Sequence, residues 1–397
     1  MQRPTLKLAD IFRRHGPSYR QRHALPKYQL RLMRAIEVCR TATLGGHALK
    51  CSQCGFKRYW YNSCRNRHCP TCQSMARAQW LDQRRRELLP VSYFHVVFTV
   101  PEQIAEIAFY NKRVVYDILF RATAQTLLTI AADPKHLGAH IGYFAVLHTW
   151  GQNLLHHPHL HCVIPGGGVC NTGESPCWIA SRKKFFVSVL VLSAMFQRVF
   201  LKMLRVAFKK GELQFFSKYK HLQVANNFYR YLDPLEKIKW VVYCKQPFGG
   251  PEHVLEYLGR YTHRVAISNQ RLVSDENDEI SFTWKDYRNS SEQKVMPLKA
   301  DEFIRRFLLH SLPPGFQRIR HYGLFANPVR RKNLELCRQL LAVLPPKSER
   351  QPKLAFEERY EALTGQPFLF CPACQLETME IVELFAPQKY VFPEDST

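Results

Sequence analysis

The sequence predicts an α+β protein with a central, mostly antiparallel sheet, flanking helices and a small N-terminal zinc ribbon. Three observations predict this class. Short runs rich in β-branched and aromatic residues recur along the middle of the chain, helical segments lie between them without regular alternation, and closely spaced cysteine pairs precede them. Hairpins mixed with helices favour an α+β arrangement over a parallel α/β sheet.

The expected elements follow in chain order. A helical lead covers Pro26 to Arg40, the zinc ribbon comes next, and a basic helix covers Ala76 to Leu89. Further helical segments are expected near 103–132, 186–208 and 251–262. The runs that are typical of strands are Tyr93 to Val100, Tyr143 to Trp150, His159 to Pro165, Lys239 to Cys244, Arg264 to Val273 and Ile280 to Trp284.

Length and charge indicate several domains and a polyanionic partner. The chain has 397 residues, enough for more than one domain. We expect residues 1–90 to form the helical lead and a zinc-ribbon DNA-binding domain, residues 91–298 a catalytic domain, and residues 299–397 a basic C-terminal region. With 57 Lys and Arg against 32 Asp and Glu, the formal net charge is +25. Such an excess, spread along the chain, favours nucleic acid as the partner.

A membrane surface is the alternative polyanion. The longest apolar run, Phe185 to Phe196, is too short to span a bilayer. Residues 1–22 contain several arginines but lack the apolar stretch of a secretory signal. We therefore expect DNA as the partner, no membrane association, and a cytoplasmic location.

Two cysteine pairs predict a structural zinc site. Cys51 and Cys54 form one C-x-x-C pair and Cys69 and Cys72 another, among thirteen cysteines in all. In a cytoplasmic chain such pairs favour metal over disulfides. Fourteen residues separate the pairs, close to the ~15–20 of a four-cysteine zinc site. We expect the four thiolates to bind one zinc tetrahedrally.

Other cysteines and histidines near this ribbon have open roles. These residues are Cys39, His47, Cys64 and His68. They are substitute ligands, part of a second site, or simply structural residues. A further C-x-x-C pair, Cys371 and Cys374, has no second pair after it. It is either a vestigial half-site or one completed by a distant cysteine or histidine, and we favour the interpretation without a functional metal.

A second candidate metal site lies in a predicted hairpin. The runs Tyr143 to Trp150 and His159 to Pro165 are joined through the polar turn Gly151-Gln152-Asn153. Strand alternation turns residues i and i+2 to one face, so His159 and His161 can hold one ion. Because histidine is also a common structural residue, spacing alone leaves a metal site and a pair of core histidines equally open.

A tyrosine pair follows on a predicted helix. Pro251 and Glu252 suit its first turn. Tyr257 and Tyr261 are four residues apart, so their rings lie on one face. Such a pair usually packs a helix onto a sheet, but beside a His-x-His hairpin in a basic protein we favour a functional role for the two tyrosines.

Three stretches resemble a known family. They are residues 148–153, 159–168 and 257–268. They are similar to the rolling-circle transposases of bacterial insertion sequences of the IS-ninety-one type, in the His-hydrophobic-His nuclease group that also includes plasmid replication initiators and conjugative relaxases. The resemblance covers nearly the whole chain, from the cysteines near Cys51 to Gly323, and its N-terminal part resembles a transposase zinc-binding domain.

The resemblance implies a fold and a reaction. The sheet would be of the His-hydrophobic-His nuclease type, and residues 91–298 would be a tyrosine-nuclease domain. Tyr257 and Tyr261 would nick and rejoin single-stranded DNA through a 5′-phosphotyrosine during rolling-circle transposition. Arg65 and Arg67 in the ribbon are expected to contact DNA, as are the neighbours of the tyrosines, Arg260 and Arg264.

The catalytic metal is a point of tension. Imidazoles alone favour zinc, copper, iron or nickel, whereas the resemblance implies magnesium or manganese, with phosphate and water adding hard ligands. Beside His159 and His161, the third ligand is Gln152 or His148, and we prefer Gln152 slightly. Two alternative functions stay open: a replication initiator or relaxase of the same group, and a non-catalytic zinc-dependent DNA-binding regulator. The zinc ribbon favours the transposase.

Overall fold

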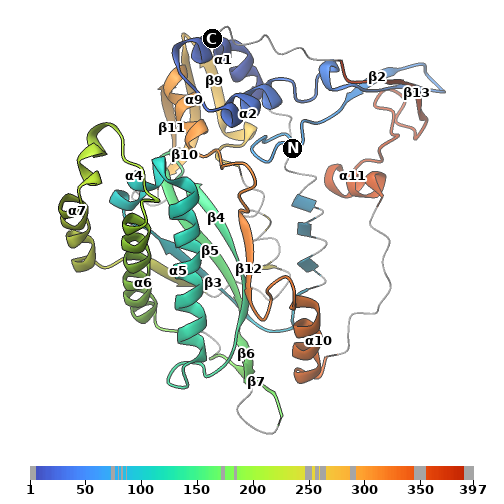
Figure 1. Cartoon of the computed structure of the whole chain (residues 1–397). Coiled ribbons are helices and arrows are strands. Elements are labelled where there is room, and N and C mark those ends of the chain that lie inside the picture. Colours follow the sequence, from blue (N-terminus) through green and yellow to red (C-terminus); the bar gives the residue numbers. More distant parts are fainter. Residues whose placement is uncertain are drawn as a thin grey trace. The chain divides into compact units, whose positions relative to one another are not determined.

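The chain forms two compact units, each assembled from separate stretches of sequence (Figure 1). The computed structural model describes residues 6–72, 77–78, 80–81, 84–85, 87–170, 175–182, 186–245, 253–254, 259, 265–286, 292–343 and 355–388. Unit 1 comprises Met1–Trp80, His263–Ser311 and Glu349–Thr397, and unit 2 comprises Leu81–Thr262 and Leu312–Ser348. This division differs from the three consecutive domains expected, because the chain returns to unit 1 twice.

Unit 2 is built on a five-stranded antiparallel sheet with the order β12-β4-β5-β3-β8. β4 (Gly142–Trp150) and β5 (His156–Pro165) form the predicted hairpin, and β3 (Tyr93–Thr99) pairs with the other side of β5. β8 (Val242–Lys245) and β12 (Ile319–Gly323) are the edge strands. The predicted α+β class with antiparallel strands is confirmed.

Helices cover one face of this sheet (Figure 1). α4 (Glu102–Tyr110) and α5 (Lys112–Ala132) pack against β5, α6 (Val189–Lys209) contacts β8, and α7 (Ala225–Lys237) packs beside α6. Alternate strand residues enter this interface and are at most 2% exposed: Phe94, Val96, Phe98, Ala145, Leu147, Leu160, Cys162 and Ile164. Burying each large apolar side chain contributes about 1.5–3 kcal/mol, so these contacts hold the helices firmly on this face of the sheet.

Helix α5 has the length and apolar composition of a membrane span, yet it lies in this core. Within its apolar segment, 67% of the residues are buried inside the structure. Val115, Leu119 and Ala122 are completely buried. Among the described residues, no other helix passes the same test of length and composition. The burial of α5 is that of a core helix.

A smaller apolar cluster completes unit 2. α10 (Arg330–Leu340) places Leu334 and Cys337 against Leu89 and Phe325. β6 (Gly167–Cys170) and β7 (Cys177–Ala180) form a separate hairpin, and a short 3₁₀ helix, η2 (Ser217–Gln223), precedes α7. These elements extend the unit at its periphery and do not add strands to the central sheet.

One part of unit 1 packs three helices with a meander. β9 (Leu272–Glu276), β10 (Glu279–Asp286) and β11 (Glu292–Lys299) form a three-stranded antiparallel sheet, which η3 (Asn269–Arg271) precedes. α9 (Ala300–Leu309) packs on this sheet and on α1 (Leu8–Arg22), and α1 packs on α2 (Lys27–Glu37). The Phe12 and Phe307 rings meet edge to face with centroids 5.4 Å apart. The strand expected from Arg264 begins only at Leu272.

The other part of unit 1 joins segments from far apart in the sequence. Its sheet has the order β13-β1-β2, all antiparallel, with β1 (Gly46–Cys51) in the centre. β2 (Lys57–Tyr61) follows β1 through a turn, whereas β13 (Met379–Phe385) comes from the C-terminal part of the chain. η1 (Ala42–Leu44) precedes β1, and α11 (Phe356–Thr364) packs Tyr360 near Trp60.

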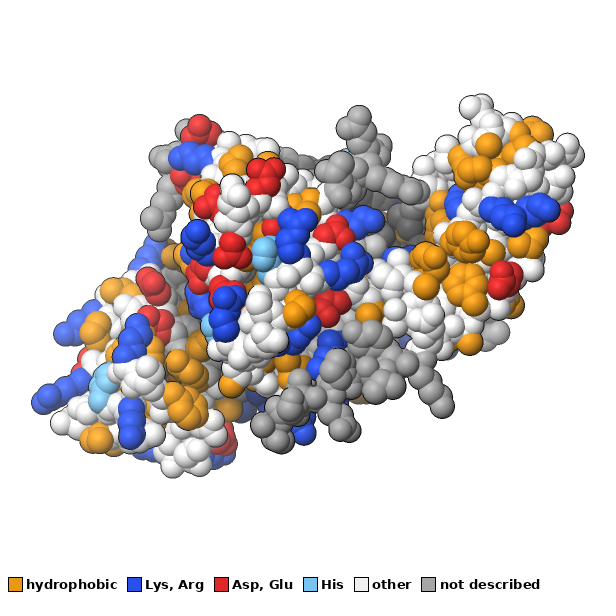
Figure 2. Space-filling view, turned by 90° about the horizontal axis from the view of Figure 1, so that it is seen from above, with side chains coloured by type: hydrophobic (Ala, Val, Ile, Leu, Met, Phe, Trp, Pro, Cys, Tyr) orange, Lys and Arg blue, Asp and Glu red, His pale blue; other side chains and the backbone are white. Residues whose placement is uncertain are grey.

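Basic side chains are distributed over the surface. On the face shown in Figure 2, Lys and Arg side chains lie among acidic and apolar ones and do not gather in a single patch. Many form surface pairs, such as Arg305 with Glu302 and Arg331 with Glu335. The excess of +25 therefore acts as a broad positive field that attracts polyanions.

Candidate functional sites

Three histidines gather on the face of the unit 2 sheet opposite the helices. His159 and His161 alternate with the core residues Leu160 and Cys162, so the pleat that buries the latter turns the histidines to the other side. His148 on β4 is the direct partner of His159 on β5. One ring nitrogen from each of the three lies within 4.8 Å of the others.

The imidazole rings converge closely. Ring centroids are 4.5 Å apart for His148 and His161, 4.9 Å for His159 and His161, and 5.5 Å for His148 and His159. His148 is 2% exposed and His161 8%, while His159 is partly exposed. The trio therefore has a buried base and an open side at His159, as a site needs if it is to meet a substrate.

Hydrogen bonds orient two of these imidazole rings. Nδ1 of His159 donates to the carbonyl oxygen of His157 at 2.6 Å. This contact selects the tautomer whose Nε2 carries a lone pair for a metal ion. Nδ1 of His161 lies 2.8 Å from Nε2 of His95 on β3, which orients that ring in the same way. The donor set suits a divalent ion held by three neutral imidazoles.

His95 itself is buried on the same face of the sheet. It is 6% exposed, and its ring stacks on that of His161 with centroids 5.0 Å apart. Burial, assisted by the positive charge of Lys245, lowers the pKa of His95 to about 4. His95 is therefore neutral near neutral pH and able to accept a hydrogen bond from His161. No motif in the sequence singles out His95.

The structure describes both candidates for the third metal ligand, but not the two predicted nucleophiles. His148, our second choice, joins His159 and His161. Gln152, our first choice, lies in the turn after β4, and its role stays a prediction. The predicted nucleophiles Tyr257 and Tyr261 lie outside the described residues, as do Arg260 and Arg264.

Two other tyrosines lie on strands of this sheet, one on each face. Tyr243 on β8 pairs with Val97, which in turn pairs with His161, so it belongs to the histidine face, where it is 51% exposed. Tyr322 pairs with Tyr143 on the core side, and their rings stack. Burial raises the pKa of Tyr322 to about 12, which makes that phenol a poor nucleophile.

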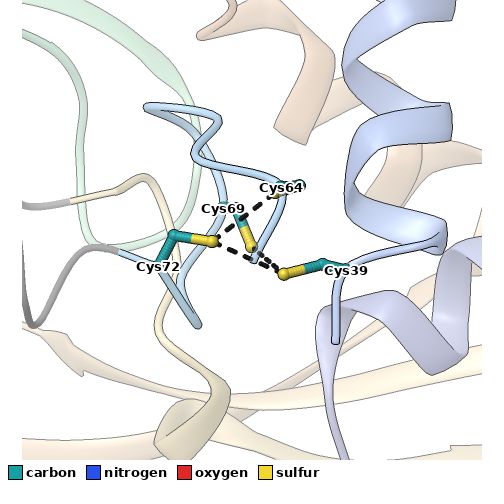
Figure 3. A group of neighbouring side chains, drawn as sticks. All are labelled: Cys39, Cys64, Cys69 and Cys72. Atoms are coloured by element: carbon teal, nitrogen blue, oxygen red, sulfur yellow. Dashed lines mark hydrogen bonds between the residues drawn. The ribbon is translucent and has the colours of Figure 1, made fainter. Parts of the chain in front are cut away.

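The predicted four-cysteine site is wrong in its grouping. Cys69 and Cys72 do not share a cluster with Cys51 and Cys54. They lie instead with Cys39 and Cys64 (Figure 3). Cys51 and Cys54 lie with Cys371 and Cys374. The reason is that Cys51 and Cys54 lie at the turn of the β1–β2 hairpin, where Cys51 pairs in register with Met379 of β13, while β2 separates them from Cys69 and Cys72.

The cluster of Cys39, Cys64, Cys69 and Cys72 has the dimensions of a zinc site. Sulfur atoms are 3.4 Å apart for Cys39 and Cys72, 3.5 Å for Cys64 and Cys72, and 3.6 Å for Cys69 and Cys39. Cys39 follows α2, and the others come from the loop after β2, converging on one point (Figure 3). The neighbouring thiols lower the pKa of Cys72 and raise that of Cys69, so the cluster holds one thiolate more readily than the rest, and binding of zinc would be coupled to release of the other protons.

The second cluster has similar spacing. Sγ of Cys51 lies 3.6 Å from Sγ of Cys374, and Sγ of Cys54 lies 3.6 Å from Sγ of Cys371. The backbone N–H of Cys54 points at Sγ of Cys51 and, with the Thr378 hydroxyl, lowers the pKa of Cys51 to about 6. The vestigial half-site is therefore excluded for Cys371 and Cys374, because their distant partners are Cys51 and Cys54. The expectation that no functional metal binds there stays a prediction.

The remaining candidates near the ribbon lie outside both clusters. The ring of His47 packs against Phe368, and burial lowers its pKa. The backbone N–H of His68 donates to the side chain of Asn66. Arg65 is exposed and Arg67 half-buried, both in the loop between Cys64 and Cys69. A zinc ion in the first cluster would hold this basic loop in place.

Known proteins match both parts of the chain. A family described as "Transposase zinc-binding domain" matches residues 11–100, and one described as "Putative transposase" matches residues 142–333. "Putative transposase y4qJ" of Sinorhizobium fredii is 59% identical over 387 residues, 97% of each chain. "Transposase for insertion sequence element IS801" of Pseudomonas savastanoi is 28% identical over 342 residues, 85% of this chain and 79% of that one. No solved structure matches.

The matched families and both relatives are described as transposases, a class of DNA-handling protein. Within that class, the chain belongs to the transposase family of insertion sequences of the IS-ninety-one type. The resemblance found in the sequence is thereby confirmed. The family assignment favours the transposase over a replication initiator or relaxase.

Proposed function

We propose that this transposase nicks and rejoins single-stranded DNA during rolling-circle transposition, with Tyr257 and Tyr261 as nucleophiles. The observation that carries the proposal is the trio of His148, His159 and His161 on the face of the sheet opposite the helices, with ring nitrogens within 4.8 Å of one another. The trio lies outside the apolar core, which is on the other face. The family supports DNA as the substrate, which the protein would meet in the cytoplasm.

The trio suits a divalent metal that activates a phosphodiester. A Mg²⁺ or Mn²⁺ ion held by His148, His159 and His161 would act as a Lewis acid on the scissile phosphate. The hydrogen bond from His159 to the His157 carbonyl keeps Nε2 turned to the site, and His95 does the same for His161. The open side at His159 leaves room for the phosphate oxygens and water that such hard ions prefer.

The tyrosines would perform the covalent step. The phenolate oxygen of one tyrosine attacks the phosphorus, the bond from phosphorus to the 3′ oxygen breaks, and that oxygen takes up a proton. The products are a 5′-phosphotyrosine and a free 3′-hydroxyl. Later, a 3′-hydroxyl attacks the phosphotyrosine, rejoins the strand and releases the phenol. Two tyrosines allow one strand end to be held while the second end is cut.

The basic surface would hold the DNA. Arg65 is exposed beside the first cysteine cluster, and Arg67, Arg260 and Arg264 are further contacts expected from the sequence. Phosphate contacts of this kind supply affinity and position the strand without reading its sequence. The zinc-binding domain would therefore orient the DNA strand that the tyrosines cut.

One experiment tests the proposal. Full-length protein is mixed with single-stranded DNA from the ends of its own element, with Mg²⁺, Mn²⁺ or Zn²⁺, and then denatured. We expect a covalent protein–DNA adduct, detected by intact mass, with Mg²⁺ or Mn²⁺ and none after chelation. Folded protein that binds this DNA but yields no adduct with any of these ions would instead identify a non-catalytic DNA-binding regulator.

A further inference from the structure

We propose that Cys51, Cys54, Cys371 and Cys374 bind a second zinc ion, which fastens the C-terminal part of the chain to the β1–β2 hairpin. All four sulfur atoms lie within 4.8 Å of one another. The matched zinc-binding domain ends at residue 100, so half of this site lies outside it. The proposal is independent of the catalytic function above.

The two halves of the site have the same local fold. In the first, the N–H of Cys51 donates to the carbonyl of Phe56, and the N–H of Gly55 donates to the carbonyl of Cys51. In the second, the N–H of Cys371 donates to Leu376, and the N–H of Gln375 donates to Cys371. The spacing of donors and acceptors is identical in the two halves.

The backbone conformations also match. Gly55 has φ of +73° and Gln375 has φ of +60°, the left-handed region that a non-glycine side chain seldom adopts. Gln375 thus accepts a strained conformation that reproduces the turn of its glycine counterpart. In each half the backbone N–H of the second cysteine points at the sulfur of the first. Two matching turns that present sulfur pairs to each other are the construction of a zinc ribbon.

The sulfur spacing distinguishes zinc from a disulfide. The contacts Cys51–Cys374 and Cys54–Cys371 are both 3.6 Å, whereas a disulfide is about 2.05 Å long. Four sulfurs placed tetrahedrally at about 2.3 Å from zinc lie about 3.8 Å apart. The observed spacing is therefore close to that of a zinc site and far from that of a covalent bond.

The surroundings show what the ion would hold together. Cys51 ends β1, next to Met379 at the start of β13, and the N–H of Ser52 donates to the carbonyl of Thr378 at 2.9 Å. The apolar cluster beneath is small, with Leu49, Phe368 and Met379 beside the buried cysteines. Because so small a core stabilises weakly, metal binding would supply much of the free energy that keeps β13 on the sheet.

The unmodified chain offers the first test, with a matched control. Cys54 and Cys177 are both exposed, but only Cys54 belongs to a cluster. We expect iodoacetamide to modify Cys177 of the folded, zinc-loaded protein while Cys54 and Cys374 stay protected, because a metal-bound thiolate is a weak nucleophile. Chelation should remove the protection of both together. Cys54 reacting as fast as Cys177 in the zinc-loaded protein would overturn the proposal.

Zinc stoichiometry provides the second test. We expect two zinc ions per wild-type chain, one for each cluster. Cys54→Ser, Cys374→Ser and the double variant should each contain one, since all three lose the same ion, and Cys177→Ser should keep two. A Cys374→Ser chain that keeps both ions would contradict the proposal. So would wild-type protein that, denatured and alkylated without reductant, lacks label on these cysteines, since that result indicates disulfides.

Discussion

His95 and His161, on neighbouring strands, are joined by a hydrogen bond of 2.8 Å between Nε2 and Nδ1. If His161 binds metal through Nε2, its Nδ1 must carry the proton and donate the hydrogen bond, which Nε2 of His95 accepts. We therefore predict that His95→Leu lowers Mn²⁺ affinity about 10- to 100-fold. Titration of Mn²⁺ followed by electron paramagnetic resonance measures this change.

The matched control is His95→Gln, whose amide oxygen is able to accept the same hydrogen bond. It should retain most of the Mn²⁺ affinity that His95→Leu loses. Thermal unfolding of both variants separates positioning from packing, because His95 is 6% exposed. Equal Mn²⁺ affinity in wild type and His95→Leu would show that His95 is only a packing residue.

The third ligand is tested by comparing His148 with Gln152. His148 belongs to the histidine trio, so His148→Ala should lower both Mn²⁺ affinity and adduct formation as strongly as His161→Ala. DNA affinity should change little, since it comes mainly from dispersed phosphate contacts. Gln152→Ala is expected to keep adduct formation near the wild-type rate. The reverse ranking in a single-turnover assay would restore Gln152 as the ligand.

Zinc in the first cluster should stabilise the loop that carries Arg65 and Arg67. Cys69 is 1% exposed and lies 3.6 Å from Cys39. We predict that Cys69→Ser loses one zinc and weakens binding of single-stranded DNA, because metal binding and local folding are linked. Arg65→Ala in zinc-loaded protein should lower the affinity for single-stranded DNA. The slope of log affinity against log salt concentration should become shallower by the contribution of about one phosphate contact. Unchanged DNA affinity in Cys69→Ser would contradict this role.

Phenylalanine variants separate the nucleophiles from other tyrosines. Tyr257→Phe combined with Tyr261→Phe keeps both rings but removes both phenolic oxygens, so the adduct should disappear while DNA binding persists. Either single variant should still form some adduct and fail in complete transposition. Intact mass spectrometry of the denatured mixture measures the adduct.

Tyr243→Phe is the control for that experiment. Tyr243 is 51% exposed on the histidine face of the sheet, so it is the described tyrosine best placed to substitute as nucleophile. We expect Tyr243→Phe to form the adduct as wild type does. An adduct that survives in the double variant and vanishes in Tyr243→Phe would move the nucleophile to β8.

Local features of this fold were predictable from the sequence. The β4–β5 hairpin was predicted because its two strands are apolar, β-branched or aromatic runs joined by a short polar turn, so that its contacts are local. The histidine face followed from the alternation of side chains along a strand, with His159 and His161 two residues apart. His95 was missed because its contact with His161 crosses 66 residues, and an isolated histidine in an apolar strand carries no signal.

The grouping of the cysteines could not be obtained from spacing. Spacing favours the nearest pairs, but Cys51 meets Cys374 across 323 residues of sequence. Strand β13 was also missed, because its residues are mostly exposed, with Leu384 at 78%, so it lacks the buried alternation of a core strand. Both failures have one cause, which is that the N-terminal sheet is completed by a distant segment.

The pairing of β1 with β13 also has a consequence for protein synthesis. β1 ends at Cys51 and its outer partner begins at Met379, so a nascent chain carries β1 with one edge open while the residues between them are translated. Contacts of such sequence separation form late. The ribosome must deliver the segment that contains Met379 before the sheet can close, and translation stopped short of that segment would yield a chain whose N-terminal sheet keeps an open edge.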